Sequence, residues 1–159
     1  MFVRHRYIVI GLAAWVVSIA ITGCAETKLA QCEKLIAKVN QGISLLEKNK
    51  GSQVTTSLQL ARDLEEVSKS TQDLNLSDPT LKGYQTQFVD IFNTVSENID
   101  KAAKALGTSK NAKADTEGRK KIKQARNEID AAGKKNQQAA KKSDQIANQL
   151  SKYCAQKEL

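Results

Sequence analysis

The feature that most constrains the fold is an apolar rhythm of alternating three- and four-residue steps, which recurs in four separate stretches of the chain. Such spacing places side chains along one face of an α-helix. We predict helices at about residues 26–49, 53–73, 79–106 and 116–156. The 159-residue chain has one proline and 4% aromatic residues, too few of either for a β-sandwich or barrel. The sequence therefore predicts an all-α protein.

Turn and cap residues separate the four stretches. Gly51 and Gly107 are placed to end helices, and Asp78 can cap a helix whose first position is Pro79. Gly133 lies inside the last stretch, where we expect a kink. In each predicted helix, the residues at this three- and four-residue spacing form a stripe along one helix face. The four stripes, in chain order, are Leu29, Cys32, Ile36, Val39, Ile43 and Leu46; Leu58, Ala61, Leu64, Val67 and Thr71; Leu81, Tyr84, Phe88, Ile91, Phe92, Val95, Ile99, Ala102 and Leu106; and Ile122, Ala125, Ile129, Ala132, Asn136, Ala139, Ser143, Ile146, Leu150 and Tyr153.

Four amphipathic helices with short connections most simply form an antiparallel up-down-up-down four-helix bundle, here with a long fourth helix. The alternative is an extended hairpin or coiled coil. It stays open because the fourth stripe consists mostly of small residues and could pair between molecules.

The first 24 residues have the layout of a signal peptide. Arg4 and Arg6 precede an apolar run of 14 residues, from Ile8 to Ile21, and no acidic residue comes before that run. A membrane-spanning helix needs about 18 or more apolar residues, so the run is short for a transmembrane span.

The run ends in Ile21-Thr22-Gly23-Cys24, which resembles the lipobox of bacterial lipoproteins. The resemblance implies cleavage between Gly23 and Cys24 and a diacylglycerol on the Cys24 sulfur. Residues 1–23 would then be the signal peptide, and residues 24–159 a lipid-anchored, extracytoplasmic helical domain. The alternative is an uncleaved signal anchor that happens to end in a cysteine.

A second stretch, from Asp78 to Tyr84 with Phe88 after it, is similar to uncharacterised helical lipoproteins of cyanobacteria. This resemblance implies no activity. It adds the plasma or thylakoid membrane to the outer membrane as a location for the anchor. The residue after Cys24 is Ala25. An Asp at this position would resemble an inner-membrane retention signal, so Ala25 favours the outer membrane.

With Cys24 assigned to the lipid, Cys32 and Cys154 remain. In an up-down-up-down bundle, the start of the first helix and the end of the fourth lie at the same end. We therefore predict a disulfide between Cys32 and Cys154, because compartments outside the cytoplasm are oxidising. Two unpaired buried thiols are the alternative.

The formal net charge of +8 is unevenly distributed. Residues 24–106 carry a net charge of −1, whereas residues 107–159 carry +7. The densest part surrounds the last connection, which the anchor would hold away from its membrane. We expect it to contact an acidic protein, an anionic polymer or an opposed bilayer, or else to be a solvated loop; without interleaved aromatic residues, nucleic acid is not expected. The candidate partner-binding residues are Lys110, Lys113, Arg119, Lys120, Lys121, Lys123 and Arg126.

Residues 24–159 contain no His, Met or Trp, which excludes imidazole metal sites and catalytic triads with a His base. The sequence has no glycine-rich phosphate-binding motif. The acidic residues Asp63, Glu65 and Glu66 fit a solvated helix face. We therefore expect no enzymatic activity, no catalytic residue, no cofactor and no metal.

Together these features predict a lipid-anchored binding or structural module, acting as an adaptor, assembly factor or tether. One alternative is a carrier of a small hydrophobic ligand, lined by Tyr84, Phe88 and Phe92. Core packing is the other interpretation of these aromatic residues. A further alternative is a structural protein that self-assembles through the fourth helix.

Overall fold

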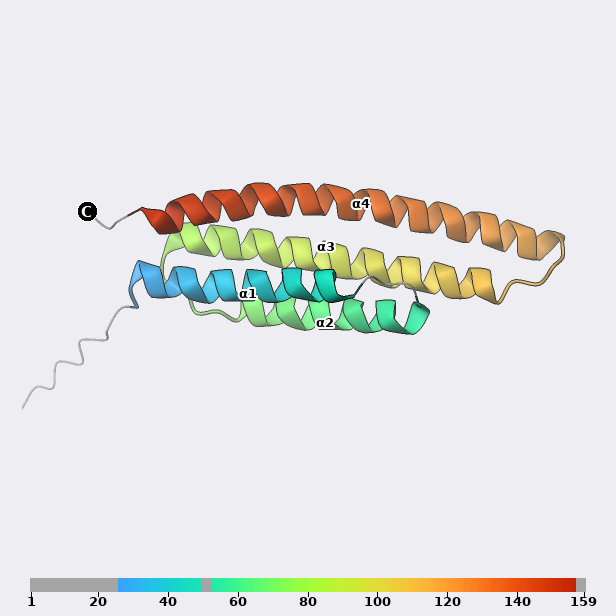
Figure 1. The fold of residues 1–159 in the computed structure, drawn as a ribbon, viewed down its shortest axis with the longest axis horizontal. Helices are drawn as coiled ribbons and strands as arrows, with labels where there is room; N and C mark the ends of the chain where they lie inside the picture. The colour runs from blue at the N-terminus through green and yellow to red at the C-terminus, as the bar shows by residue number, and fades with distance from the viewer. Residues whose placement is uncertain (1–25, 50–52, 157–159) are drawn as a thin grey trace, which may run out of the picture.

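The computed structural model describes residues 26–49 and 53–156, and these form four α-helices. They are α1 (Lys28–Lys48), α2 (Val54–Gln72), α3 (Pro79–Lys110) and α4 (Thr116–Ala155). Figure 1 shows the chain running up, down, up and down, with α4 extending along the whole bundle. The predicted antiparallel four-helix bundle with a long fourth helix is confirmed.

The two ends of the bundle differ. The start of α1, the connection between α2 and α3, and the end of α4 lie together at one end, which we call the base (Figure 1). The connection between α3 and α4 lies at the opposite end with the turns on either side of it, residues 107–126, which we call the tip. α3 and α4 form most of the tip, because α1 and α2 are much shorter and α2 reaches only its edge, where Val54 lies beside Gly107.

The hydrophobic core lies around α3, which packs along both α2 and α4. Phe88 and Leu81 are fully buried, and Phe92 is 2% exposed. In contrast, α1 packs mainly on α2 and makes little contact with α4. The core therefore lies between α3 and its two neighbours α2 and α4, and α1 leaves part of α4 uncovered.

Two predicted core positions are wrong. Leu29 is 62% exposed and Ile122 is 43% exposed. The face of α1 that packs on α2 and α3 includes Leu35, which is fully buried. Leu29, in the first turn of α1, lies outside this face and is exposed. Ile122 lies in the part of α4 that extends past α1 and α2, where fewer helices are present to cover it.

The prediction that Gly107 ends the third helix is also wrong. Gly107 does not end the third helix, because α3 continues to Lys110 and the backbone amide of Asn111 donates to the Gly107 carbonyl. A Cβ added at Gly107 would lie 3.8 Å from the Val54 Cγ1 of α2, an ordinary contact distance. Gly133 does not interrupt α4, which is one continuous helix from Thr116 to Ala155.

Candidate functional site

The disulfide joins α1 to α4 at the base. The Sγ atoms of Cys32 and Cys154 are 2.07 Å apart and their Cα atoms 5.9 Å apart, across a sequence separation of 122 residues. The predicted pairing is confirmed. The predicted lipid-attachment residue, Cys24, lies outside the described residues. The described chain begins two residues later, at Glu26, beside the base.

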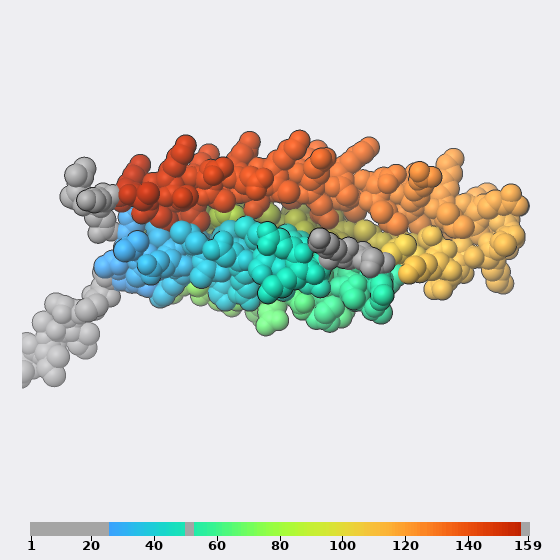
Figure 2. All heavy atoms as spheres, viewed as in Figure 1, coloured from blue at the N-terminus to red at the C-terminus, as the bar shows by residue number. Residues whose placement is uncertain are grey.

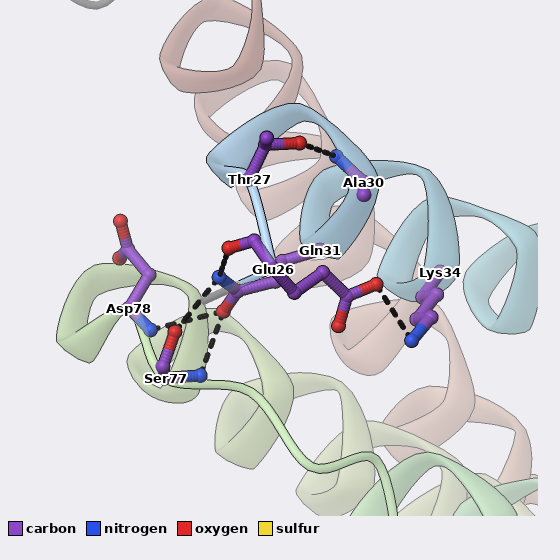
Figure 3. A network of polar contacts seen from close by, with 7 residues as sticks. All are labelled: Glu26, Thr27, Ala30, Gln31, Lys34, Ser77 and Asp78. Atoms are coloured by element: carbon purple, nitrogen blue, oxygen red, sulfur yellow. Dashed lines mark hydrogen bonds and ion pairs between the residues drawn. The ribbon is translucent and has the colours of Figure 1, made fainter. Parts of the chain in front are cut away.

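A buried glutamine joins α1 to the connection between α2 and α3 (Figure 3). The Gln31 Nε2 donates to the Glu26 carbonyl and to the Ser77 Oγ, both at 2.8 Å. Its Oε1 accepts from the backbone amides of Ser77, at 2.7 Å, and Asp78, at 3.0 Å. Gln31 is 2% exposed, so these four bonds satisfy a side chain that would otherwise be costly to bury.

Asp78 connects α3 to α4. Its Oδ1 accepts from the Leu81 amide at 2.9 Å, which caps α3, and its Oδ2 accepts from the Tyr153 hydroxyl at 2.6 Å. Burial raises the pKa of Asp78, but hydrogen bonds from Tyr153 and from the amides of Leu81 and Thr80, with the charge of Lys28, lower it below 3.8 overall. The hydrogen bond to Asp78 raises the pKa of Tyr153 above 10.0. The pair is therefore an ionised carboxylate and a neutral phenol at neutral pH.

Tyr153 gathers further contacts at the base. The Lys28 Nζ lies 3.9 Å from the centroid of its ring, a cation–π contact between α1 and α4. The ring of Tyr84 on α3 lies 6.2 Å away, centroid to centroid. Gln85, one residue further along α3, donates to the carbonyls of Thr71, Gln72 and Leu74 and so caps the end of α2. All four helices are therefore fastened together at the base.

The tip contains the candidate partner-binding residues and has none of this fastening. Asp115 caps α4 by accepting from the Gly118 amide at 2.7 Å, and Gly118 packs so closely on the Lys113 carbonyl that a Cβ would collide with it. The basic residues surround this tight turn and are all exposed, and within residues 26–49 and 53–156 none of them forms an ion pair. They are Lys110, Lys113, Arg119, Lys120, Lys121, Lys123 and Arg126, which we call the basic cluster.

Part of the basic cluster lies where positive charge lowers helix stability, whereas Lys110 lies in the last turn of α3, where positive charge is favourable. Arg119, Lys120 and Lys121 are in the first two turns of α4, next to the positive end of the helix dipole. Arg119 and Lys123 are four residues apart on one helix face, a like-charge spacing that is also destabilising. The exposed side chain of Ile122 lies among these residues in the sequence. The tip thus presents positive charge and one apolar side chain to solvent.

The three aromatic residues of α3 do not line a common cavity. Phe88 and Phe92 are core residues with ring centroids 6.3 Å apart, whereas Tyr84 packs at the base. Only Phe92 borders the groove described below. These placements favour core packing for Phe88 and a fastening role for Tyr84.

The acidic side chains of α2 lie on its outer surface. Glu65 and Glu66 are exposed, and Asp63 accepts from Gln59 on the same helix. In the described part of the chain, no three His, Cys, Asp or Glu residues are grouped closely enough to bind a metal ion.

No protein-family model, curated protein or solved structure matches this chain. Of the described helices, none combines the length and the apolar character needed to cross a membrane.

Proposed function

We propose that the chain is a lipid-anchored, extracytoplasmic module that holds its basic cluster away from the membrane, for contact with an acidic partner. The signal-peptide layout and the lipobox supply the anchor, at Cys24. The described chain starts at the base, and the tip lies at the other end of α3. At ~1.5 Å per residue, the 32 residues of α3 span about 48 Å.

The observation that carries this proposal is the concentration of unpaired positive charge at the start of α4. The exposed cations near the start of α4 do not stabilise the bundle there; they are Arg119, Lys120, Lys121 and Lys123. An acidic surface bound at the tip would neutralise the repulsion between these positive charges. The repulsion is therefore relieved only in the complex. An adaptor, assembly factor or tether would use the tip in this way.

The partner that fits the tip is an acidic protein surface or an anionic polymer. Arg119 and Arg126 can bind carboxylates or phosphates in a bidentate manner, and the lysines add charge without fixed geometry. Ile122 offers one apolar contact in the middle of the cluster. The described tip has no aromatic side chain for stacking on bases, which disfavours nucleic acid.

Self-assembly through α4 is less well supported. Its buried positions, which include Ala125, Ala132, Ile146 and Leu150, pack within the molecule, mainly against α3. A second copy would have to bind another surface of α4, which is largely charged.

Charge reversal at the tip tests the proposed contact. In Lys120→Glu/Lys121→Glu/Lys123→Glu, we expect molecules that co-purify with the membrane-bound protein to be lost. The matched control is Lys134→Glu/Lys135→Glu/Lys141→Glu, which makes the same change in net charge at exposed positions of α4 closer to the base. An unchanged set of co-purifying molecules in the tip variant would contradict the proposal and favour a solvated loop.

The anchor has its own test. Mass spectrometry of the membrane fraction should find a chain that begins at Cys24 and carries a diacylglycerol. An intact 159-residue chain with a free Cys24 thiol would refute the lipoprotein assignment.

A further inference from the structure

A groove lies between α1 and α4, with α3 as its floor. Figure 2 shows atoms of α3 between these two helices on the face that it presents. The groove has a volume of about 330 Å³, and the side chains that line it include Ile43, Leu46, Phe92, Val95, Ile99 and Asn136. This volume is at the lower end of the ~300–1,000 Å³ of small-molecule sites, which are likewise mostly apolar with few polar groups.

The groove exists because α1 and α4 are joined at the base and diverge beyond it. The disulfide holds them together at Cys32 and Cys154, but they make little other contact. The α4 side chains that face the groove, such as Ala140 and Ser143, are too small to reach α1. The apolar side chains of α1 and α3 are therefore left partly uncovered.

One buried polar atom in this groove has no hydrogen-bond partner among the described residues. Asn136 lines the groove, and its Oδ1 is buried without a hydrogen bond in the described structure. Asn136, Leu46 and Ile99 also line a second hollow of about 380 Å³, nearer the tip, so the Asn136 side chain stands between two apolar spaces. A buried acceptor without a partner is uncommon and needs an explanation, such as a ligand that supplies the missing donor.

We propose that this groove binds a small, neutral, largely apolar molecule, and that the half-buried Asn136 side chain turns its Oδ1 toward the groove to accept a hydrogen bond from the hydroxyl of that molecule. The apolar walls select the body of the ligand, and the buried acceptor selects the hydroxyl. Asp144 at the groove disfavours an anionic ligand. The proposal does not depend on the anchor or on the basic cluster, and it differs from a pocket formed by the three aromatic residues of α3.

The test uses a matched pair of probes on the full chain in lipid nanodiscs. A photoreactive octanol labels the protein, and unlabelled octanol or its isomer heptyl methyl ether, which has no donor, competes for the site. Mass spectrometry then locates the labelled peptides. We expect labelling at the groove segments of α1, α3 and α4, with octanol competing roughly 3- to 10-fold better than the ether, as one hydrogen bond would give.

Two variants separate the hydrogen bond from the groove. Asn136→Leu should keep the labelling but bring the two competitors within about twofold of each other, since no acceptor remains to tell them apart. Gln137→Leu, an exposed neighbour on α4, is the control and should retain the preference for octanol. Ser143→Phe should fill the groove and abolish labelling by both probes, with folding verified by circular dichroism. Equal competition by octanol and the ether in the wild type, an unchanged preference in Asn136→Leu, or labelling outside the groove would each overturn the proposal.

Discussion

Among individual residues, Asp78 connects several elements at the base. It caps α3, accepts from Tyr153 of α4 and lies near Lys28 of α1. Its backbone amide donates to Gln31. One carboxylate thus lies at the meeting point of three helices, and its ionised form makes these contacts.

The lowered pKa of Asp78 predicts how the stability depends on pH. A carboxylate whose pKa is lower in the folded protein stabilises it fully above the unfolded value of 3.8, and this contribution is lost as the pH falls through the folded value. We expect Asp78→Asn, which keeps a good N-cap residue, to be less stable than the wild type at neutral pH. Urea unfolding between about pH 2 and 6 should show the difference shrinking below the unfolded pKa. A difference that is constant across this range would contradict the assignment.

Part of the base could be predicted at the residue scale and part could not. Asp78 before Pro79 is a local capping signal, and the structure confirms it. Gln31 is different, because its partners Ser77 and Asp78 are 46 and 47 residues away and only the fold brings them together. A glutamine on the flank of a helix stripe gives no local sign of this role. The same holds for Gln85, whose partners Thr71, Gln72 and Leu74 belong to the end of α2 and the connection after it.

Among the helices, the same substitution at two glycines should have opposite effects. An added Cβ meets nothing within 4 Å at Gly133 in α4, so Gly133→Ala should stabilise the protein by about 0.5–1 kcal/mol through helix propensity. At Gly42 in α1 the added Cβ would collide with the buried ring of Phe92, so Gly42→Ala should destabilise it. Thermal unfolding of the two variants provides the measurement. Effects of the same sign would contradict the packing described here.

The tip should show a trade-off between stability and binding. Lys120→Glu places a negative charge in the first turns of α4 and should raise the free energy of unfolding by about 0.3–1 kcal/mol at low salt. Lys152→Glu makes the same change in the last turn of α4, where it should lower the free energy of unfolding. Unfolding at two salt concentrations tests this, since both effects should shrink as salt is added. A Lys120→Glu protein less stable than the wild type would contradict the electrostatic account of the tip.

Helix positions could be predicted well from periodicity, but their ends and faces could not always be. α3 continues past Gly107 to Lys110, although glycine is a local helix-ending signal. Leu29 fits the three- and four-residue spacing of α1, yet it is exposed, and Leu35 is the buried residue. At Leu29, tertiary packing decided between two faces of the helix that local spacing allows.

For the whole molecule, the disulfide should contribute most to holding α1 in place. It closes a separation of 122 residues, and α1 has few other contacts with α4. We expect Cys32→Ala/Cys154→Ala to lose about 2–5 kcal/mol of unfolding free energy. Hydrogen exchange should show the largest loss of protection in α1. An unchanged unfolding free energy, or protection lost first in α3, would contradict this role.

The arrangement of the whole molecule could be predicted from the order and direction of the four expected helices. Up-down-up-down connectivity placed both paired cysteines at one end and the basic cluster at the other, as the structure shows. The groove could not be predicted in this way. It depends on how far α1 and α4 diverge, and spacing along the sequence carries no information about that distance.

The central claim is that the tip contacts an acidic molecule, and crosslinking in intact cells tests it most directly. A photoreactive amino acid in place of Ile122 would report on the tip, and the same amino acid in place of the exposed Glu66 on α2 is the control. We predict a crosslinked acidic protein or anionic polymer from position 122 that is absent at position 66 and lost when Lys120, Lys121 and Lys123 are changed to Glu. Crosslinks no more abundant at position 122 than at position 66, or crosslinks that survive the charge reversal, would contradict the claim.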